Sequence, residues 1–209
     1  MIKAVLFDYD GVLTMDKTGS LTTHRYLSEQ TGIGLDALRE AFRPYNHDLN
    51  LGRISHAEIW PDVCKRLGRD INPALLVNAF ESTPLNKRMW QLALALKGHC
   101  KLGIVTDNKQ DRIAHLRTYQ GLDALFDPIV VSSDVGSDKT SAAIFLHALN
   151  HLRVTPQEAL FIDNSPGNLF APQALGMNTV FFDDEENDVP ALIDALKNKF
   201  GLPVPGAAS

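Results

Sequence analysis

Five short apolar runs along the chain have the length and composition of buried β-strands. They are rich in valine, isoleucine, leucine and phenylalanine, and they occupy residues 2–7, 101–106, 128–131, 159–162 and 179–182. Near-continuous apolar runs are typical of strands buried on both faces of a parallel sheet. Helical periodicity separates the later runs, over about 110–119, 141–152, 166–175 and 189–200. This alternation predicts an α/β fold, a doubly wound, Rossmann-like parallel sheet with helices on both faces.

The gap between the first two predicted strands is far longer than one crossover needs, which is about a dozen residues. Helical patterns fill it: an apolar face over 35–42, a Ser55–Glu58 capping box before 59–67, and a further pattern over 73–80. Thr83 and Pro84 then begin a helix over 85–96 that returns the chain to the sheet.

We therefore expect a discontinuous core with a helical cap inserted into it. The core consists of residues 1–14 and 83–200, and the cap of residues 15–82. The last segment, 201–209, is rich in proline, glycine and alanine, which predicts a flexible tail.

Composition narrows the classes of protein further. With 209 residues, 44% hydrophobic and 22% charged, the chain resembles an average globular protein, which excludes disordered and disulfide-scaffold classes. No apolar run reaches the roughly 18 residues needed to cross a membrane. The net charge of −5 argues against nucleic acid as a partner. Two isolated cysteines, and a start without an export signal, predict a cytoplasmic protein.

Polar residues capable of chemistry follow four of the predicted strands. In an open parallel sheet, ligands bind beyond the carboxyl ends of the strands, so these residues are expected to share one crevice. They are Asp8 and Asp10 after the first strand, Thr106, Asp107 and Asn108 after the second, Lys139 beyond the third, and Asp163 and Asn164 after the fourth.

This set of side chains suits phosphoryl transfer. A carboxylate can attack phosphorus and form an acyl phosphate, which divides one difficult hydrolysis into two easier steps. Asp8 and Asp10 lie two residues apart around a tight bend, so one can address phosphorus and the other the leaving oxygen. Carboxylates repel each other and the substrate unless a cation intervenes, and Mg²⁺ prefers oxygen ligands. Asp8, Asp163 and the Asp10 carbonyl can supply them.

The remaining strand-end residues fit the binding of phosphate. Thr106, with Asp107, Asn108 and the backbone N–H groups at a helix start, can bind phosphate oxygens. Lys139 can neutralise the charge on the nucleophile and the phosphate. Lys109 is a rival for that role, and its position along the chain favours Lys139.

The ordered set Asp8-x-Asp10-Gly-Val, Thr106, Lys139 and Asp163 resembles the haloacid dehalogenase superfamily of phosphatases and related phosphotransferases. The resemblance covers essentially the whole chain, including a small cap after the first strand. It implies that Asp8 is the nucleophile and that Asp10 protonates the leaving group and then activates water. It further implies that Thr106 and Lys139 hold phosphate while Asp163 helps to hold Mg²⁺. The expected activity is Mg²⁺-dependent hydrolysis of a small phosphomonoester, such as a sugar phosphate, through an aspartyl-phosphate intermediate.

Two departures from the family pattern bear on alternative functions. Asn164 stands where the family commonly has a second acid, which leaves open whether it ligates the metal. Residues 14–18 lack the Asp-Thr continuation common in the family's sugar-phosphate mutases. A phosphomutase, a 2-haloacid dehalogenase (which needs neither Mg²⁺ nor the acid at Asp10) and a non-catalytic binding protein are the alternatives. The expected partner is a small phosphorylated metabolite, and specificity is expected from the cap and from residues 16–20 beside it. Both monomer and homodimer are compatible with the sequence.

Overall fold

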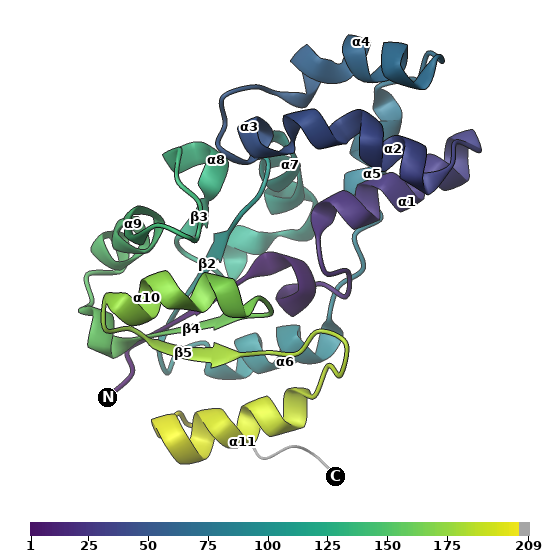
Figure 1. The fold of residues 1–209 in the computed structure, drawn as a ribbon. Helices are drawn as coiled ribbons and strands as arrows, with labels where there is room; N and C mark the ends of the chain where they lie inside the picture. Colours follow the sequence, from purple (N-terminus) through teal and green to yellow (C-terminus); the bar gives the residue numbers. More distant parts are fainter. Residues whose placement is uncertain (205–209) are drawn as a thin grey trace.

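A parallel five-stranded sheet lies at the centre of the molecule (Figure 1). The computed structural model describes residues 1–204. The strands are β1 (Ala4–Phe7), β2 (Lys101–Thr106), β3 (Ile129–Val131), β4 (Ala159–Asp163) and β5 (Asn178–Phe181). Their order is β3-β2-β1-β4-β5, and every neighbouring pair is parallel. Each strand overlaps its predicted run, so the α/β fold class is confirmed.

Helices cover both faces of this sheet. They are α6 (Lys87–Leu96), α7 (Gln110–Gln120), α9 (Ala142–Leu152), α10 (Phe170–Ala174) and α11 (Val189–Phe200). Because successive strand residues point to opposite faces, β1 contributes to two apolar layers. Val5 and Phe7 pack in a cluster with residues of α6, α7 and α11. Ala4 and Leu6 pack in a second cluster with α9 and the segment around α10.

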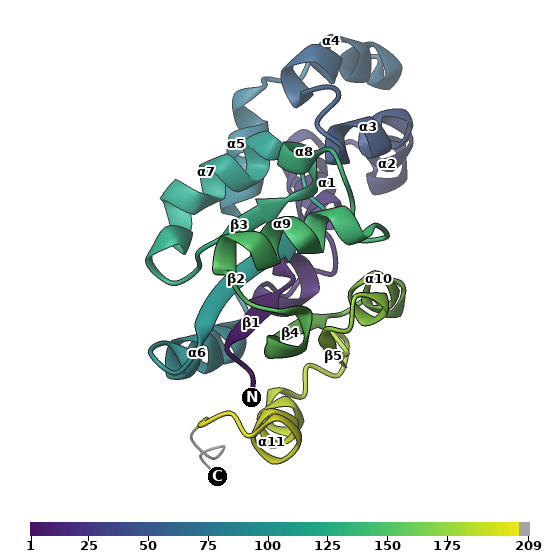
Figure 2. The same ribbon diagram turned by 90° about the vertical axis from the view of Figure 1, so that its left-hand side faces the viewer.

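The first part of the long segment between β1 and β2 is helical, as predicted, and its helices gather at one end of the molecule, opposite α11 (Figures 1 and 2). They are α1 (Gly19–Thr31), α2 (Leu35–Phe42), α3 (Asn46–Asn50), α4 (His56–Leu67) and α5 (Ala74–Glu81). The two crossings between this segment and the sheet pair with each other through an antiparallel bridge between Thr14 and Leu85. The helical insertion and the sheet are therefore joined by two adjacent segments of the chain.

Several elements differ from the predicted ones. The returning helix begins at Lys87 instead of residue 85, because Leu85 takes part in the bridge and Asn86 caps the helix through Met89 N–H. The prediction of a helix over 166–175 is wrong for its first half. Residues Pro166–Leu169 form a 3₁₀ turn, and α10 follows it. A short helix, α8 (Ser132–Val135), was not predicted and leads from β3 towards Lys139.

The predicted tail, 201–209, is described only as far as residue 204. Leu202 and Val204 are buried in the large apolar cluster, and their side chains cover the end of α11. This part of the segment is therefore packed against the molecule and differs from the predicted flexible tail. Residues 205–209 lie outside the described part of the chain. Among the described residues, no helix combines the length and apolar character that a membrane crossing requires.

Candidate active site

The candidate site lies where the strand order changes direction. β2 and β3 extend the sheet on one side of β1, whereas β4 and β5 extend it on the other. Such a point leaves a crevice beyond the carboxyl ends of the two central strands. Asp8 follows β1, and Asp163 is the last residue of β4. The Asp8 N–H donates to the Ile162 carbonyl at 2.9 Å, so the two strand ends are held side by side.

Lys139 links these two carboxylates. Its Nζ lies 2.8 Å from Asp8 Oδ2 and 2.7 Å from Asp163 Oδ2. Its side chain is only 2% exposed, and its backbone N–H donates to Asp107 Oδ1 at 3.0 Å. A buried ammonium needs such partners, because its desolvation is otherwise uncompensated. The structure therefore brings Lys139, and not Lys109, between the strand ends.

Negative charge exceeds positive charge around Asp8. Burial raises the pKa of Asp8 to about 8; the carboxylates of Asp163 and Asp10 add to this rise, and Lys139 opposes it. For Lys139, burial alone would lower the pKa, but the carboxylates of Asp8, Asp163 and Asp107 outweigh it and raise the pKa. Lys139 therefore remains charged, and it balances only part of the negative charge of these carboxylates.

Asp10 is held by a buried guanidinium. Arg112 Nη1 and Nη2 each lie 2.9 Å from one oxygen of the Asp10 carboxylate, in a bidentate pair. Asn108 Nδ2 also donates to Asp10 Oδ2 at 2.8 Å. Arg112 is 1% exposed, and its Nη2 reaches Thr83 Oγ1 at 3.2 Å, where the chain returns from the helical insertion. Both oxygens of Asp10 are therefore engaged in this structure.

A tight turn places Asp8 and Asp10 beside β4. Thr14 N–H closes the turn onto the Tyr9 carbonyl at 3.1 Å, and Gly11 adopts φ +77° inside it. A Cβ at Gly11 would lie 2.1 Å from Asn164 Nδ2. Only glycine satisfies both the left-handed conformation and this approach. The Asn164 amide thus packs against the turn, and its Nδ2 donates to Asp184 Oδ1 at 3.2 Å.

The segment after β2 faces the same crevice. Thr106 is buried, and its Oγ1 accepts from Asn108 Nδ2 at 3.2 Å. The Asn108 N–H donates to Ser132 Oγ at 3.0 Å, which ties this segment to the end of β3. For Asp107, burial raises the pKa, and the nearby charge of Lys139 opposes this. The predicted phosphate-binding residues are thus gathered at one strand end.

A polar cavity of about 440 Å³ opens over these residues. Its floor includes Asp8, Asp10, Thr106, Asp107, Asn108 and Lys139. Its other side is formed by the helical insertion, through residues 17–20 at the start of α1 and Asn46 and Asn50 of α3. The sequence analysis anticipated a contribution from 16–20, whereas it did not single out the two asparagines of α3.

The donor chemistry of the site suits Mg²⁺. Asp8 and Asp163 supply carboxylate oxygens, and the predicted third ligand is the Asp10 carbonyl. Within residues 1–204, no group of three or more His, Cys, Asp or Glu side chains forms a metal-binding cluster. The predicted set does not require one, because Mg²⁺ typically keeps several waters and takes only one or two carboxylates. Two carboxylates, Asp8 and Asp163, share the single ammonium group of Lys139, and an additional cation would offset the remaining negative charge.

Two residues that hold the carboxylates of the site, Arg112 and Asn168, were also not predicted from the sequence. Arg112 follows Asn108 by four residues and adjoins Ile113 and Leu116 on the buried side of α7. That periodicity was a usable signal, because a charged residue on a buried helix side needs an opposite charge. Asn168 Nδ2 donates to both oxygens of Asp163, at 3.1 and 3.2 Å, and orients that carboxylate.

Comparison with known proteins agrees with this geometry. Residues 2–176 match the family described as haloacid dehalogenase-like hydrolase. The glyceraldehyde 3-phosphate phosphatase of Methanopyrus kandleri is 26% identical over 194 residues, covering 86% of this chain and 83% of that protein. The rat (Rattus norvegicus) bifunctional epoxide hydrolase 2 is 26% identical over 234 residues; the match covers 98% of this chain, which spans only 41% of that protein.

Solved structures share the fold. A predicted HAD-like family hydrolase from Porphyromonas gingivalis superposes with a TM-score of 0.75 and 25% identity, over 94% of this chain and 98% of that one. The HAD family enzyme BT-2542 from Bacteroides thetaiotaomicron, in complex with magnesium and inorganic phosphate, gives a TM-score of 0.66 and 19% identity, over 87% and 94% of the two chains.

Proposed function

The chain belongs to the haloacid dehalogenase-like hydrolase family, and from this premise we propose that it is a Mg²⁺-dependent phosphatase of small phosphomonoesters. One observation carries the proposal: Lys139 contacts both Asp8 and Asp163 beneath a polar cavity at the switch point of the sheet. The phosphatase from Methanopyrus kandleri and the magnesium–phosphate complex of BT-2542 support it.

In the proposed reaction, Asp8 attacks phosphorus and displaces the alcohol oxygen, which gives an aspartyl phosphate. Asp10 donates the proton that the alcohol takes up, and it then accepts a proton from the water that attacks the same phosphorus. The second step releases inorganic phosphate and restores Asp8. Thr106 and Lys139 bind phosphate oxygens throughout, with Asp107 and Asn108 beside them. Bound through Asp8, Asp163 and the Asp10 carbonyl, Mg²⁺ would neutralise charge on the phosphate.

The Arg112 pair adds a condition to this mechanism. Since both Asp10 oxygens accept hydrogen bonds from Arg112, Asp10 must release at least one of them before it can serve as an acid. Arg112 also bonds to Thr83, at one of the two crossings to the helical insertion. We propose that residues 15–82 act as a cap on the core formed by 1–14 and 83–200, and that its closure over the substrate limits water access and frees Asp10.

The proposal also covers the cellular compartment, the partner and the oligomeric state of the protein. Both Cys64 and Cys100 are free thiols in the structure, which fits the reducing cytoplasm that we propose for this protein. Its partner would be a small phosphorylated metabolite, and either a monomer or a homodimer would carry the complete set of residues described above.

Release of phosphate from p-nitrophenyl phosphate, with and without MgCl₂, tests the activity. We expect turnover with Mg²⁺, loss of turnover in excess EDTA, and a fall of at least about a thousandfold in Asp8→Asn, whose circular dichroism should match the wild type. Full activity of Asp8→Asn, or of the wild type in EDTA, would contradict the mechanism. Chloride release from 2-chloropropionate in EDTA would favour the dehalogenase alternative, which needs no acid at Asp10.

A further inference from the structure

Lys109 is a charged residue of the cavity that the proposed reaction does not use. It immediately precedes α7 and lines the cavity that opens over Asp8. Its Nζ donates to Ser20 Oγ at 3.0 Å, in the first turn of α1. Lys109 therefore lies where the helical insertion closes over the cavity, whereas Lys139 lies at the strand ends.

The carboxylates nearest to Lys109 are already engaged by other groups. Asp10 pairs with Arg112, Asp111 pairs with His56 Nδ1 at 2.8 Å, and Asp107 accepts from the Lys139 N–H. Within residues 1–204, no carboxylate oxygen lies within 4.0 Å of Lys109 Nζ. A cation that is partly removed from water normally has an opposite charge beside it.

The balance of charge around Lys109 points the same way. Burial lowers the pKa of Lys109 to about 8, and the charge of Arg112 lowers it further, while Asp10, Asp111 and Asp107 oppose the shift without cancelling it. An anion beside Nζ would oppose the effects of burial and of Arg112 on the pKa of Lys109.

The cavity around Lys109 selects for a hydrophilic ligand. The residues that line it within the described part of the chain are aspartates, asparagines, lysines, threonines, serines and a glycine, with no aromatic or aliphatic side chain among them. Such a wall offers no aromatic side chain on which a nucleobase could stack and no aliphatic side chain against which an acyl chain could pack. Ser20 and Asn46 flank Lys109 where this cavity meets a second one of about 10 Å³, beneath α1.

We infer that the substrate is a small, polar phosphomonoester with a second anionic group, a carboxylate or another phosphate, which is bound by Lys109. Ser20 and Asn46 would provide hydrogen bonds beside the lysine. The reacting phosphate would lie at Asp8 and Lys139, and the second anion at the cap side of the cavity. This inference rests on the proposed phosphatase function and adds the class of substrate to it.

Two matched pairs of esters test the inference. 3-Phosphoglycerate differs from glycerol 3-phosphate by a carboxylate in place of a hydroxymethyl group, and fructose 1,6-bisphosphate differs from fructose 6-phosphate by a second phosphate. In the wild type, kcat/KM should favour the more anionic member of at least one pair by about tenfold or more. The pair that shows this preference identifies the anion as carboxylate or phosphate.

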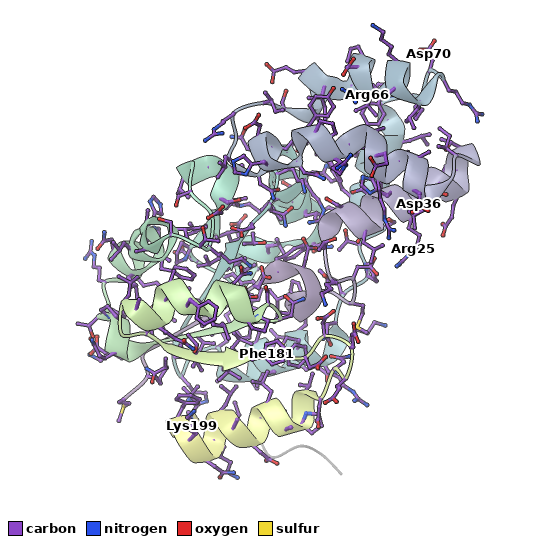
Figure 3. The ribbon with its side chains drawn as sticks, viewed as in Figure 1. Arg25, Asp36, Arg66, Asp70, Phe181 and Lys199 are labelled. Atoms are coloured by element: carbon purple, nitrogen blue, oxygen red, sulfur yellow. The ribbon has the colours of Figure 1, made fainter. Side chains whose placement is uncertain are left out.

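Variants assign the preference to one side chain. Lys109→Met should reduce the ratio within the pair at least about tenfold, and Lys109→Arg should restore most of it. Lys199→Met is the matched control, because Lys199 is exposed on α11, far from the helical insertion (Figure 3). The ratio of kcat/KM values within the pair should be the same in this variant as in the wild type. A ratio near one in the wild type, or a ratio that survives in Lys109→Met, would overturn the inference.

A binding measurement separates this inference from the proposed function. Calorimetry on Asp8→Asn with MgCl₂ should show tighter binding of the more anionic ester, and the added Lys109→Met substitution should abolish the difference. If p-nitrophenyl phosphate is not hydrolysed, the phosphatase proposal fails, and the calorimetry still decides the role of Lys109. If it is hydrolysed without any preference or binding difference within the pairs, only the inference fails.

Discussion

At the scale of single residues, the pair between Asp10 and Arg112 shows how the site depends on buried charge. Both side chains are almost fully buried, and two hydrogen bonds of 2.9 Å join them. Burial alone would lower the pKa of Arg112, but the charge and hydrogen bonds of Asp10 outweigh it, so the pKa is raised. The guanidinium of Arg112 thus stays charged beside Asp10 in the resting structure.

Arg112→Met should therefore destabilise the protein strongly. It removes one member of a buried pair and leaves the Asp10 carboxylate without a counter-charge, which typically costs about 3–5 kcal/mol. Arg112→Lys should recover only part of this loss, because an ammonium cannot form the bidentate pair. The free energy of unfolding, measured by urea denaturation, checks both expectations.

Arg117 offers a matched control on the same helix. It pairs with Asp123 at 2.7 Å, but both side chains are largely exposed, so Arg117→Met should cost less than about 1 kcal/mol. Equal losses in the Arg112→Met and Arg117→Met variants would show that burial does not determine the strength of the Asp10 pair.

At the scale of the secondary-structure elements, α1 begins directly against Arg112. A Cβ at Gly19 would lie 2.3 Å from both Cζ and Nη1 of Arg112. Gly19→Ala should therefore displace the guanidinium or the start of α1, at a cost of about 1–3 kcal/mol. Urea denaturation measures this loss. Gly34→Ala is the control, because nothing lies within 4 Å of its added Cβ, and its effect should stay below about 1 kcal/mol.

The same helix shows where sequence patterns reach their limit. The strands and most helices could be predicted, because their buried sides are apolar and recur with the period of the element. The buried side of α1 instead contains Thr22, Thr23 and His24, so the hydrophobic pattern that marks a helix is absent. A helix whose buried side is polar has to be found from its three-dimensional contacts.

The candidate site likewise contains a part that could be predicted from the sequence and a part that could not. Asp8, Asp163 and Thr106 could be expected to lie together, because parallel strands bring their carboxyl ends to one edge. The bidentate bond from Arg112 to Asp10 could not, because it depends on the rotation of α7 about its axis and on the shape of the turn at Gly11. Strand-end chemistry follows from topology, whereas pairing between side chains requires the packed structure.

At the scale of the whole molecule, a net charge of −5 coexists with a cavity suited to anions. Lys139 is buried between carboxylates, Arg112 is buried against Asp10, and Lys109 lines the cap side of the cavity. Local potential in a cleft depends on such placement more than on net charge. Under the proposed function, these cations would allow an acidic protein to bind a phosphate ester.

His24, on the buried side of α1, links the stability of the molecule to pH. His24 is 4% exposed, and its ring centroid lies 5.1 Å from that of Phe42. Burial lowers the pKa of His24 to about 4, and the charges of Lys109, Arg39 and His56 contribute to the same shift. The folded protein therefore keeps this imidazole neutral at a pH where the unfolded chain has already protonated it.

Stability should consequently fall as the pH decreases from about 6.5, the unfolded pKa, towards 4, and His24 should contribute up to about 3 kcal/mol of the loss. Above pH 6.5 both states are neutral at this group, so its contribution is constant. The His24→Gln variant has no imidazole to protonate at this position. Between pH 7 and pH 4.5, the decrease in its free energy of unfolding should therefore be smaller than that of the wild type by about 2 kcal/mol or more. His147→Gln, at an exposed position, should follow the wild-type curve. Parallel wild-type and His24→Gln curves in urea denaturation would show that the buried imidazole does not set the acid stability of the molecule.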